Sequence, residues 1–244
     1  RPGREADDRR HRRLLRLPPP VHRIHVVLHR ALAQALRWDW VWIDPASSAR
    51  PPRYRPADIQ PPAPSQVAAL LESVEANDPA FATFLRPAAT TGARRSQLLA
   101  LRWSDVDLKR GALSLTRALV DGPNGPVLAP TKTGCTYRVE LDELTVEILL
   151  VHRTRDVAPD AFVFCHPDGR PWLPNHVTQR FITARDAAGL ARFRLHDLRH
   201  FMATQMLAVG VPIAVVAQRL SHARASTTLN VYAHAVPGGD RAAA

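Results

Sequence analysis

The sequence predicts an α+β fold, in which a mainly helical domain contains a small antiparallel β-sheet and follows a partial all-α segment. Apolar residues recur at three- and four-residue steps in several stretches, as in helices with one buried face. Two shorter stretches, 112–119 and 136–141, alternate apolar and polar residues as half-buried strands do. An Asp-Gly and an Asn-Gly pair lie between them within 121–125 and favour tight turns. Together these patterns indicate helices around a small sheet.

The first expected helix covers 21–38, where Ile24, Val27 and Leu28 begin one apolar stripe. The three prolines at 18–20 are expected to break the chain before it. A second helix is expected to begin at Pro64, because proline suits the first helical position. Seven further helices are expected over 79–91, 95–102, 143–155, 175–188, 196–208, 212–220 and 224–234.

Composition divides the chain into two expected domains. Residues 1–16 carry seven arginines without periodicity, which indicates a basic arm. Six prolines within 49–64 are too dense for a helix or a sheet interior and indicate a linker. We therefore expect a first segment over 1–60 and a second domain over 61–244. The chain starts at Arg1 and not at Met, which indicates a fragment or a misassigned start.

Charge and cysteine content narrow the class of function. The formal net charge is +11, and all but two of the 33 basic residues are arginine. A strong basic excess favours a polyanionic partner such as DNA, although an arginine-rich composition is also what genomic base bias produces. Two cysteines are too few for a disulfide framework and fit a reducing cytoplasm. The apolar runs are too short to span a membrane, so a membrane partner is not expected.

The segment His196-Asp197-Leu198-Arg199-His200 is the densest polar cluster on an expected helix. Its two histidines and Arg199 are spaced i, i+3, i+4, so they share one face. That face suits a phosphate, since arginine offers a two-pronged donor and histidine a titratable proton. The alternative is zinc, which two histidines at i and i+4 can bind. No third ligand follows from the spacing, and neither a metal nor another cofactor is expected.

Four further positions gain meaning only beside that cluster. Gly92 precedes Arg94 at the start of an expected helix, whose free N–H groups favour anions. Lys132 lies beside the expected hairpin, and Ser221-His222 ends an expected helix. Tyr232 lies near the C-terminus, where a single tyrosine is most often a packing residue.

Taken together, these residues resemble the tyrosine recombinase (phage integrase) family. The resemblance covers residues 61–236 and extends weakly back to residue 20, where the helix over 21–38 looks like the end of the family's core-binding domain. It rests on an ordered set of motifs: Arg94 in TGARRSQLLALRWSDVDL, Lys132 near the hairpin, HDLRH at 196–200, Ser221-His222, and Tyr232 in TTLNVYAH.

The resemblance implies a site-specific DNA recombinase that cuts and rejoins strands through a 3′-phosphotyrosyl intermediate. Tyr232 is the implied nucleophile, and Arg94 and Arg199 are the implied clamps on the phosphate oxygens. Lys132 resembles the acid that protonates the leaving 5′-oxygen. His196 resembles the base or hydrogen-bond partner near the tyrosine, and His222 is expected to contact the scissile phosphate.

Three departures from the family pattern bear on this expectation. Gln97 stands where a carboxylate is usual after the first arginine, and is expected to pin that arginine without charge. Ser221 replaces the usual glycine, which is expected to strain the turn if its φ is positive. Only the last part of a core-binding domain precedes the linker, so weakened activity or an inactive remnant is an alternative.

The resemblance also implies partners and a location. Double-stranded DNA is the expected substrate, held by a homotetramer in the cytoplasm at the nucleoid, with an accessory directionality factor as a further candidate partner. A second reading is a non-catalytic helix-turn-helix protein, with residues 205–228 as the binding element. That reading accounts for the charge but leaves the order of Arg94, Lys132, His196 and Tyr232 without explanation.

Overall fold

The computed structural model describes residues 18–49, 51, 60–123, 125–131, 134, 136–190, 193–221 and 225–232. The chain divides into two compact units, Arg1–Asp58 and Ile59–Ala244, and each is described by itself. Several expectations lie outside the described residues: the basic arm, most of the linker, Lys132, His222 and everything after Tyr232.

The first unit is built on one long helix, α2 (Pro18–Arg37). The prolines expected to break the chain instead form its first turn, where the backbone N–H groups have no intrahelical acceptor and their loss costs nothing. The following segment folds back through a contact between His29 and Asp44, with 2.7 Å between Nδ1 and Oδ2. Ile24, Val27 and Leu28 are more than half exposed, so the predicted stripe has no cover in the described part of this unit.

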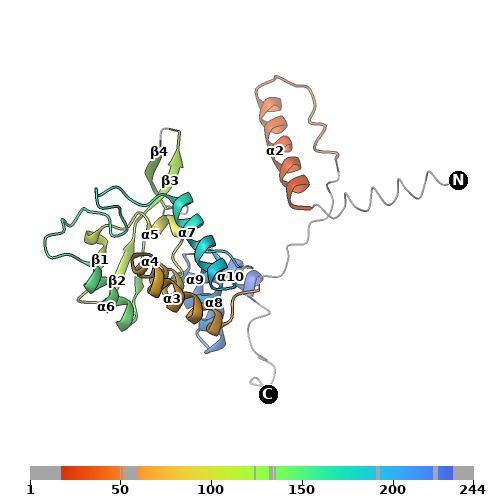
Figure 1. The fold of residues 1–244 in the computed structure, drawn as a ribbon. Helices are drawn as coiled ribbons and strands as arrows, with labels where there is room; N and C mark the ends of the chain where they lie inside the picture. The colour runs from red at the N-terminus through yellow and green to blue at the C-terminus, as the bar shows by residue number, and fades with distance from the viewer. Residues whose placement is uncertain are drawn as a thin grey trace, which may run out of the picture. The chain divides into compact units, whose positions relative to one another are not determined.

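The second unit packs helices around two small antiparallel sheets (Figure 1). One sheet has the strand order β1-β2-β5, and the other is the β3–β4 hairpin, which projects from the unit in Figure 1. The strands are β1 (Val106–Asp107), β2 (Ala112–Leu115), β3 (Arg117–Gly122), β4 (Gly125–Pro130) and β5 (Tyr137–Glu140). The helices are α3 (Pro64–Asn77), α4 (Pro79–Thr91), α5 (Arg95–Leu98), α6 (Glu143–His152), α7 (Pro174–Ala187), α8 (Asp197–Ala208), α9 (Ile213–Arg219) and α10 (Ala225–Tyr232), with a 3-10 turn at Trp103–Asp105.

The α+β prediction is confirmed, and the structure corrects it in two places. The stretch 112–119 contains parts of two strands that lie in different sheets. Strand β2 pairs with β5, and β3, which begins after Thr116, forms a hairpin with β4. Strand β4 went unpredicted because it carries two prolines and its residues are nearly all exposed, so no alternation marks it. The expected helix over 95–102 ends at Leu98, because the next segment turns away to pair Arg102 with Phe162.

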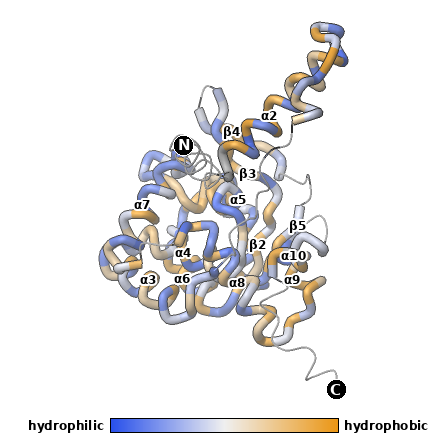
Figure 2. Tube along the Cα trace, turned by 90° about the vertical axis from the view of Figure 1, so that its right-hand side faces the viewer, coloured by the Kyte–Doolittle hydropathy of each residue, from blue (hydrophilic) through white to orange (hydrophobic). Residues whose placement is uncertain are grey.

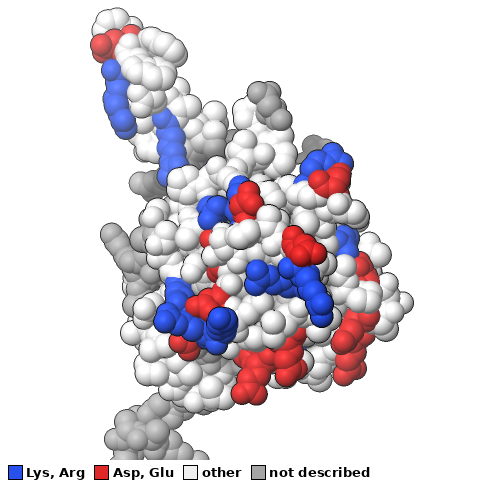
Figure 3. Space-filling view, turned by 90° about the vertical axis from the view of Figure 1, so that its left-hand side faces the viewer, with Lys and Arg blue, Asp and Glu red and all other residues white. Residues whose placement is uncertain are grey.

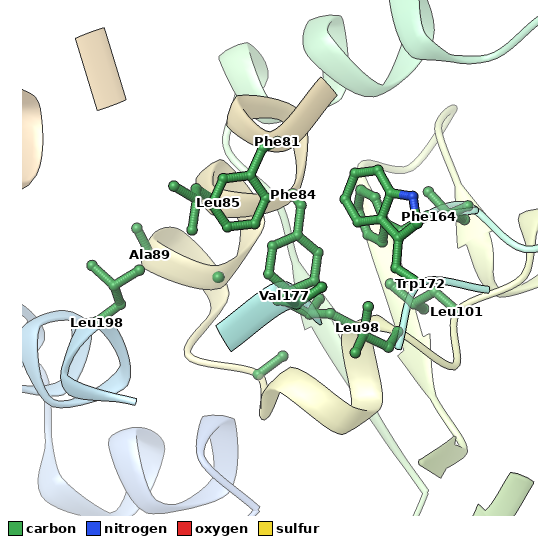
Figure 4. Packing of buried hydrophobic residues seen from close by; sticks show 14 of the residues in the cluster. Phe81, Phe84, Leu85, Ala89, Leu98, Leu101, Phe164, Trp172, Val177 and Leu198 are labelled. Carbon is green, nitrogen blue, oxygen red and sulfur yellow. The ribbon is translucent and has the colours of Figure 1, made fainter. Parts of the chain in front are cut away.

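Aromatic side chains fill the main core of the second unit (Figure 4). Phe84 is fully buried and meets Phe164 edge to face, with ring centroids 5.1 Å apart. Phe81 stacks on Phe84 from the same helix at 5.9 Å. Arg180 of α7 lies over the rings of Phe81 and Trp172, at 4.6 and 4.3 Å from their centroids. This cluster fixes α4 against α7 and the segment that leads into it.

Hydropathy follows this burial (Figure 2): many helices carry hydrophobic positions along one side and hydrophilic positions along the other. A second, smaller core joins α8, α9 and α10 through Met202, Leu207, Val216, Leu220 and Tyr232. Arg219 then ties α9 to the rest, because its Nη2 donates to the carbonyls of Thr90 and Glu140 at 3.1 and 2.9 Å. Among the described residues, no helix is both long and apolar enough to cross a membrane.

Replacing Phe84 with alanine should lower the free energy of unfolding by about 3–5 kcal/mol, because the change leaves a cavity between three aromatic rings. Urea denaturation followed by circular dichroism measures the loss. The control is Val151→Ala, whose side chain is 88% exposed and should change stability by less than about 0.5 kcal/mol. Equal effects of the two substitutions would contradict the packing described here.

Candidate active site

The turn between α4 and α5 places Arg94 at a cleft. Helix α4 ends at Gly92, whose φ of 66° lies in the left-handed region that glycine tolerates. A Cβ added at Gly92 would lie 2.1 Å from the Met202 methyl carbon, so α8 packs directly on this backbone. The chain then extends to Arg94, which precedes the first residue of α5. The sequence Thr-Gly-Ala-Arg thus sets both the turn and the position of the arginine.

Arg199 is buried beneath the same turn. Its side chain is only 4% exposed, and Nη1 donates to the Gly92 carbonyl at 2.5 Å. Nη2 donates to the carbonyl of Leu220, at the end of α9. Burial, followed by repulsion from Arg94, lowers the pKa of the Arg199 guanidinium to about 10. The group therefore stays positively charged at neutral pH and links the ends of two helices.

Arg94 and Arg199 line one cleft of about 390 Å³, together with other basic groups. The rest of its lining comprises Phe84, Ala88, Ala93, Arg95, Ser96, Thr178, Arg194, Leu195 and His196. Within the described part of the chain, neither Arg94 nor Arg199 pairs with a carboxylate, and the buried Nη1 of Arg94 has no hydrogen-bond partner. Burying a charged donor without a partner is costly, so the cleft is built to receive an anion.

Gln97 and Tyr137 support this cleft with uncharged groups. Gln97 is buried, and its Oε1 accepts from the Arg94 backbone N–H at 3.0 Å and from the Tyr137 hydroxyl at 2.9 Å. Burial raises the pKa of Tyr137, while Arg199 and Arg94 nearby oppose that rise. The expected pinning of Arg94 by Gln97 thus acts on its backbone, and it leaves the positive charge of the guanidinium uncompensated.

Tyr232 lies in the small core beneath α8. It is 2% exposed and packs against Met202 and Leu220, with its hydroxyl 2.6 Å from Nδ1 of His200. Burial raises the pKa of Tyr232 to about 12, and the charge of Arg199 partly opposes the rise. The implied nucleophile is therefore neutral in this arrangement and already hydrogen-bonded to an imidazole.

His196 lies at the exposed rim of the cleft, one helical turn before His200. The two rings meet edge to face with centroids 5.1 Å apart. Desolvation of the ring nitrogens, then repulsion by His200 and Arg199, lowers the pKa of His196 to about 4, although part of the residue stays open to solvent. The direction of this shift leaves His196 neutral at pH 7.

The structure brings four of the six predicted site residues into one region: Arg94, His196, Arg199 and Tyr232. Lys132 and His222 lie outside the described residues, so their roles stay predictions. Sequence reasoning placed His200 on the same helix face but gave it no role, although it is the histidine that contacts the tyrosine hydroxyl. The i, i+4 spacing of the two histidines was the signal that they share a surface. In the described part of the chain, no three histidine, cysteine or carboxylate side chains gather as metal ligands would.

The residue before His222 has the expected strained backbone. Ser221 has a φ of 49°, in the left-handed region, directly after α9. Glycine would adopt this backbone conformation without strain, so the expectation that serine strains the turn is confirmed.

Comparison with known proteins agrees with this fold. Residues 63–237 match the Phage integrase family, and the chain belongs to that family of tyrosine recombinases. It is 30% identical over 166 residues to the putative prophage phiRv2 integrase of Mycobacterium tuberculosis, covering 66% of this chain and 44% of that protein. It is 25% identical over 170 residues to a XerC-like tyrosine recombinase of Caldanaerobacter subterraneus, covering 60% and 44%. The chain thus spans less than half the length of these relatives.

Two solved structures share the fold. The Tn1549 transposon integrase in complex with transposon right end DNA superposes with a TM-score of 0.77 at 18% identity, over 93% of this chain and 79% of that one. A lambda integrase tetramer bound to a Holliday junction gives a TM-score of 0.62 at 18% identity, over 84% and 57%. At these identities the likeness concerns the fold.

Replacing Ser221 with glycine should stabilise the protein by about 0.5–1 kcal/mol, because a non-glycine residue in the left-handed region costs about 1–2 kcal/mol and glycine's extra unfolded-state entropy offsets part of the gain. Thermal unfolding measures the change. The matched control is Ser73→Gly within α3, where the same substitution should destabilise by about 0.5–1 kcal/mol. A loss of stability at both positions would contradict the strain at Ser221.

Proposed function

We propose that the chain carries the catalytic domain of a site-specific DNA recombinase, an integrase that cuts and rejoins strands through a 3′-phosphotyrosyl intermediate. The observation that carries the proposal is the cleft in which Arg94 and Arg199 present buried positive charge without a carboxylate partner among the described residues. Membership of the phage integrase family gives this anion site a substrate, the DNA phosphodiester.

The chemistry suits the residue types. Phosphoryl transfer depends mainly on positioning and on stabilising charge at the non-bridging oxygens. The planar guanidinium groups of Arg94 and Arg199 offer paired donors for those oxygens. The oxygen of Tyr232 attacks phosphorus while the bond to the 5′-oxygen breaks, and Lys132 protonates the leaving oxygen. His222 donates to the same phosphate, and His196 borders the cleft as the implied base or hydrogen-bond partner of the tyrosine.

The energy of the broken phosphodiester is kept in the phosphotyrosyl bond. A second 5′-hydroxyl can then attack and reseal the DNA on a new partner strand. The reaction as proposed needs neither a nucleotide cofactor nor a metal ion.

The proposal extends to partners and to the first unit. Double-stranded DNA and a homotetramer are the proposed assembly, supported by the DNA and the tetramer named for the structural relatives. Residues 1–60 are proposed as the end of a core-binding clamp, with 61–244 as the catalytic domain. The cytoplasm at the nucleoid is the proposed place of action, and an accessory directionality factor is a further proposed partner. The face shown in Figure 3 carries interspersed acidic and basic groups, so the proposed contact with DNA rests on the basic cleft and not on charge spread over a whole face.

Wild-type protein should form a denaturant-resistant adduct with nicked suicide duplexes made from the DNA that flanks the gene, and Tyr232→Phe should form none. The reaction should proceed fully in a metal chelator. Gel electrophoresis under denaturing conditions measures the adduct. Sensitivity to the chelator would favour a zinc hydrolase. DNA binding that is equal in both proteins, without any adduct, would favour a helix-turn-helix binding protein or an inactive remnant.

Replacing Arg94 with glutamine should slow adduct formation by about 10²–10³-fold, because it removes a preorganised donor from the charge that develops on phosphate. Single-turnover rates at saturating DNA isolate this step from binding. Arg170→Gln is the control, since it removes the same charge from an exposed arginine that pairs with Asp168 at the surface. A rate for Arg94→Gln equal to that of the control would refute the role of the cleft.

A further inference from the structure

The hydroxyl of Tyr232 makes a short contact with His200. Nδ1 of His200 lies 2.6 Å from that oxygen, and the ring centroids are 5.7 Å apart. The hydroxyl group has one proton to donate, and an imidazole that is protonated at Nε2 has a free lone pair at Nδ1 to accept it. The contact therefore has the geometry of proton transfer from the tyrosine oxygen.

We propose that His200 is a further catalytic residue, whose Nδ1 takes the proton from the Tyr232 hydroxyl as the tyrosine oxygen attacks the DNA phosphorus. This inference rests on the proposed function. The bond from Oη to phosphorus forms, the bond from phosphorus to the 5′-oxygen breaks, and the Oη proton moves to His200. A separate acid, Lys132 in the proposed mechanism, supplies the proton for the leaving oxygen. Resealing runs the same steps in reverse, with His200 returning the proton to Tyr232.

The surroundings of His200 keep its imidazole able to accept that proton. The groups that face it are Tyr232 from α10, Asp197 and Arg199 from α8, and Arg194 and His196 just before α8. Burial and the two arginines lower the pKa of His200, while Asp197 opposes them. The Asp197 carboxylate is also held by the Arg194 guanidinium at 2.9 Å, which weakens its pull on the imidazole. The ring is therefore neutral at pH 7.

Tyr232 needs a proton acceptor more than a solvent-exposed tyrosine does, because it ionises less readily. Its pKa is raised to about 12 by burial, so very little tyrosinate exists at neutral pH. A base in direct contact allows attack without prior ionisation.

His196 is less well placed for this step. It lines the cleft with Arg94 and Arg199, and its ring touches that of His200 edge to face. Between the two histidines, the one hydrogen-bonded to the tyrosine in the described structure is His200. This arrangement divides the pair: His196 faces the phosphate, and His200 faces the nucleophile.

The decisive variant is His200→Asn, because asparagine can place an amide group near the position of Nδ1 but cannot take a proton at neutral pH. Cleavage of suicide DNA should slow by about 10²–10⁴-fold, the usual contribution of a general base. The wild-type rate should fall below a pH set by the His200 imidazole, and the variant should lose that dependence. His176→Asn, an exposed histidine on α7, is the matched control and should cleave as wild type does.

DNA with a sulfur atom at the scissile 5′-bridging position separates the base from the acid, since a thiolate leaves without protonation. His200→Asn should stay slow on this DNA, whereas Lys132→Ala should recover. Wild-type rate and pH profile in His200→Asn would overturn the assignment and reduce His200 to a positioning residue. Recovery of His200→Asn on the sulfur substrate would also overturn it. Absence of any adduct with wild-type protein would overturn the proposed function and this inference with it.

A measurement without DNA tests the hydrogen bond itself. Nitrogen NMR of the protein labelled at histidine should show His200 protonated at Nε2, with Nδ1 as an acceptor. Tyr232→Phe should shift the His200 Nδ1 resonance and leave that of His176 unchanged. Protonation of His200 at Nδ1, or no shift in Tyr232→Phe, would overturn the inference whatever the DNA assays give.

Discussion

The buried guanidinium of Arg199 is the interaction on which the arrangement of the site depends. It joins the carbonyl of Gly92, two residues before Arg94, to the carbonyl of Leu220, just before Ser221 and His222. Its own helix carries His200 and begins directly after His196. One side chain therefore relates three segments of the chain: the turn at Gly92, the first part of α8 and the end of α9. An arginine suits this place because its planar group can donate to two carbonyls and keep its charge when buried.

The cleft keeps its positive charge because the side chains that support Arg94 are uncharged. Gln97 accepts a hydrogen bond from the Arg94 backbone, and the Tyr137 hydroxyl donates to the same Gln97 oxygen. Both groups are uncharged, so they do not cancel the charge of the Arg94 guanidinium. Elsewhere in the unit, arginines pair with acids in the usual way, as Arg180 does with Asp78. Arginine therefore has two roles in this unit. Arg180 connects structural elements through an ion pair, whereas in the described part of the chain Arg94 and Arg199 keep an uncompensated charge for an anion.

Much of this organisation was predictable from the sequence, and the residues show why. Helical periodicity and end signals such as Pro64 and Gly92 are local, so the helices were found within a few residues of their bounds. The order of Arg94, His196, Arg199 and Tyr232 pointed to one site before any distance was known. Strand β4 was not predicted because it is exposed and rich in proline. The bond between His200 and Tyr232 joins residues 32 apart, and it depends on how α10 packs under α8. Periodicity carries no information on such packing.

The conformation of Gly92 has an evolutionary consequence. A side chain at position 92 would lie 2.1 Å from the Met202 methyl carbon, and it would also have to adopt a left-handed backbone. A shift of the Met202 side chain, or a smaller residue at 202, relieves the first obstacle but not the second, so the backbone alone restricts position 92 to glycine. Because Met202 is one turn beyond Arg199 on α8, a compensating change there also disturbs the helix that carries the clamp. Homologous proteins with this turn should therefore keep a glycine at position 92 even where the residue at position 202 differs.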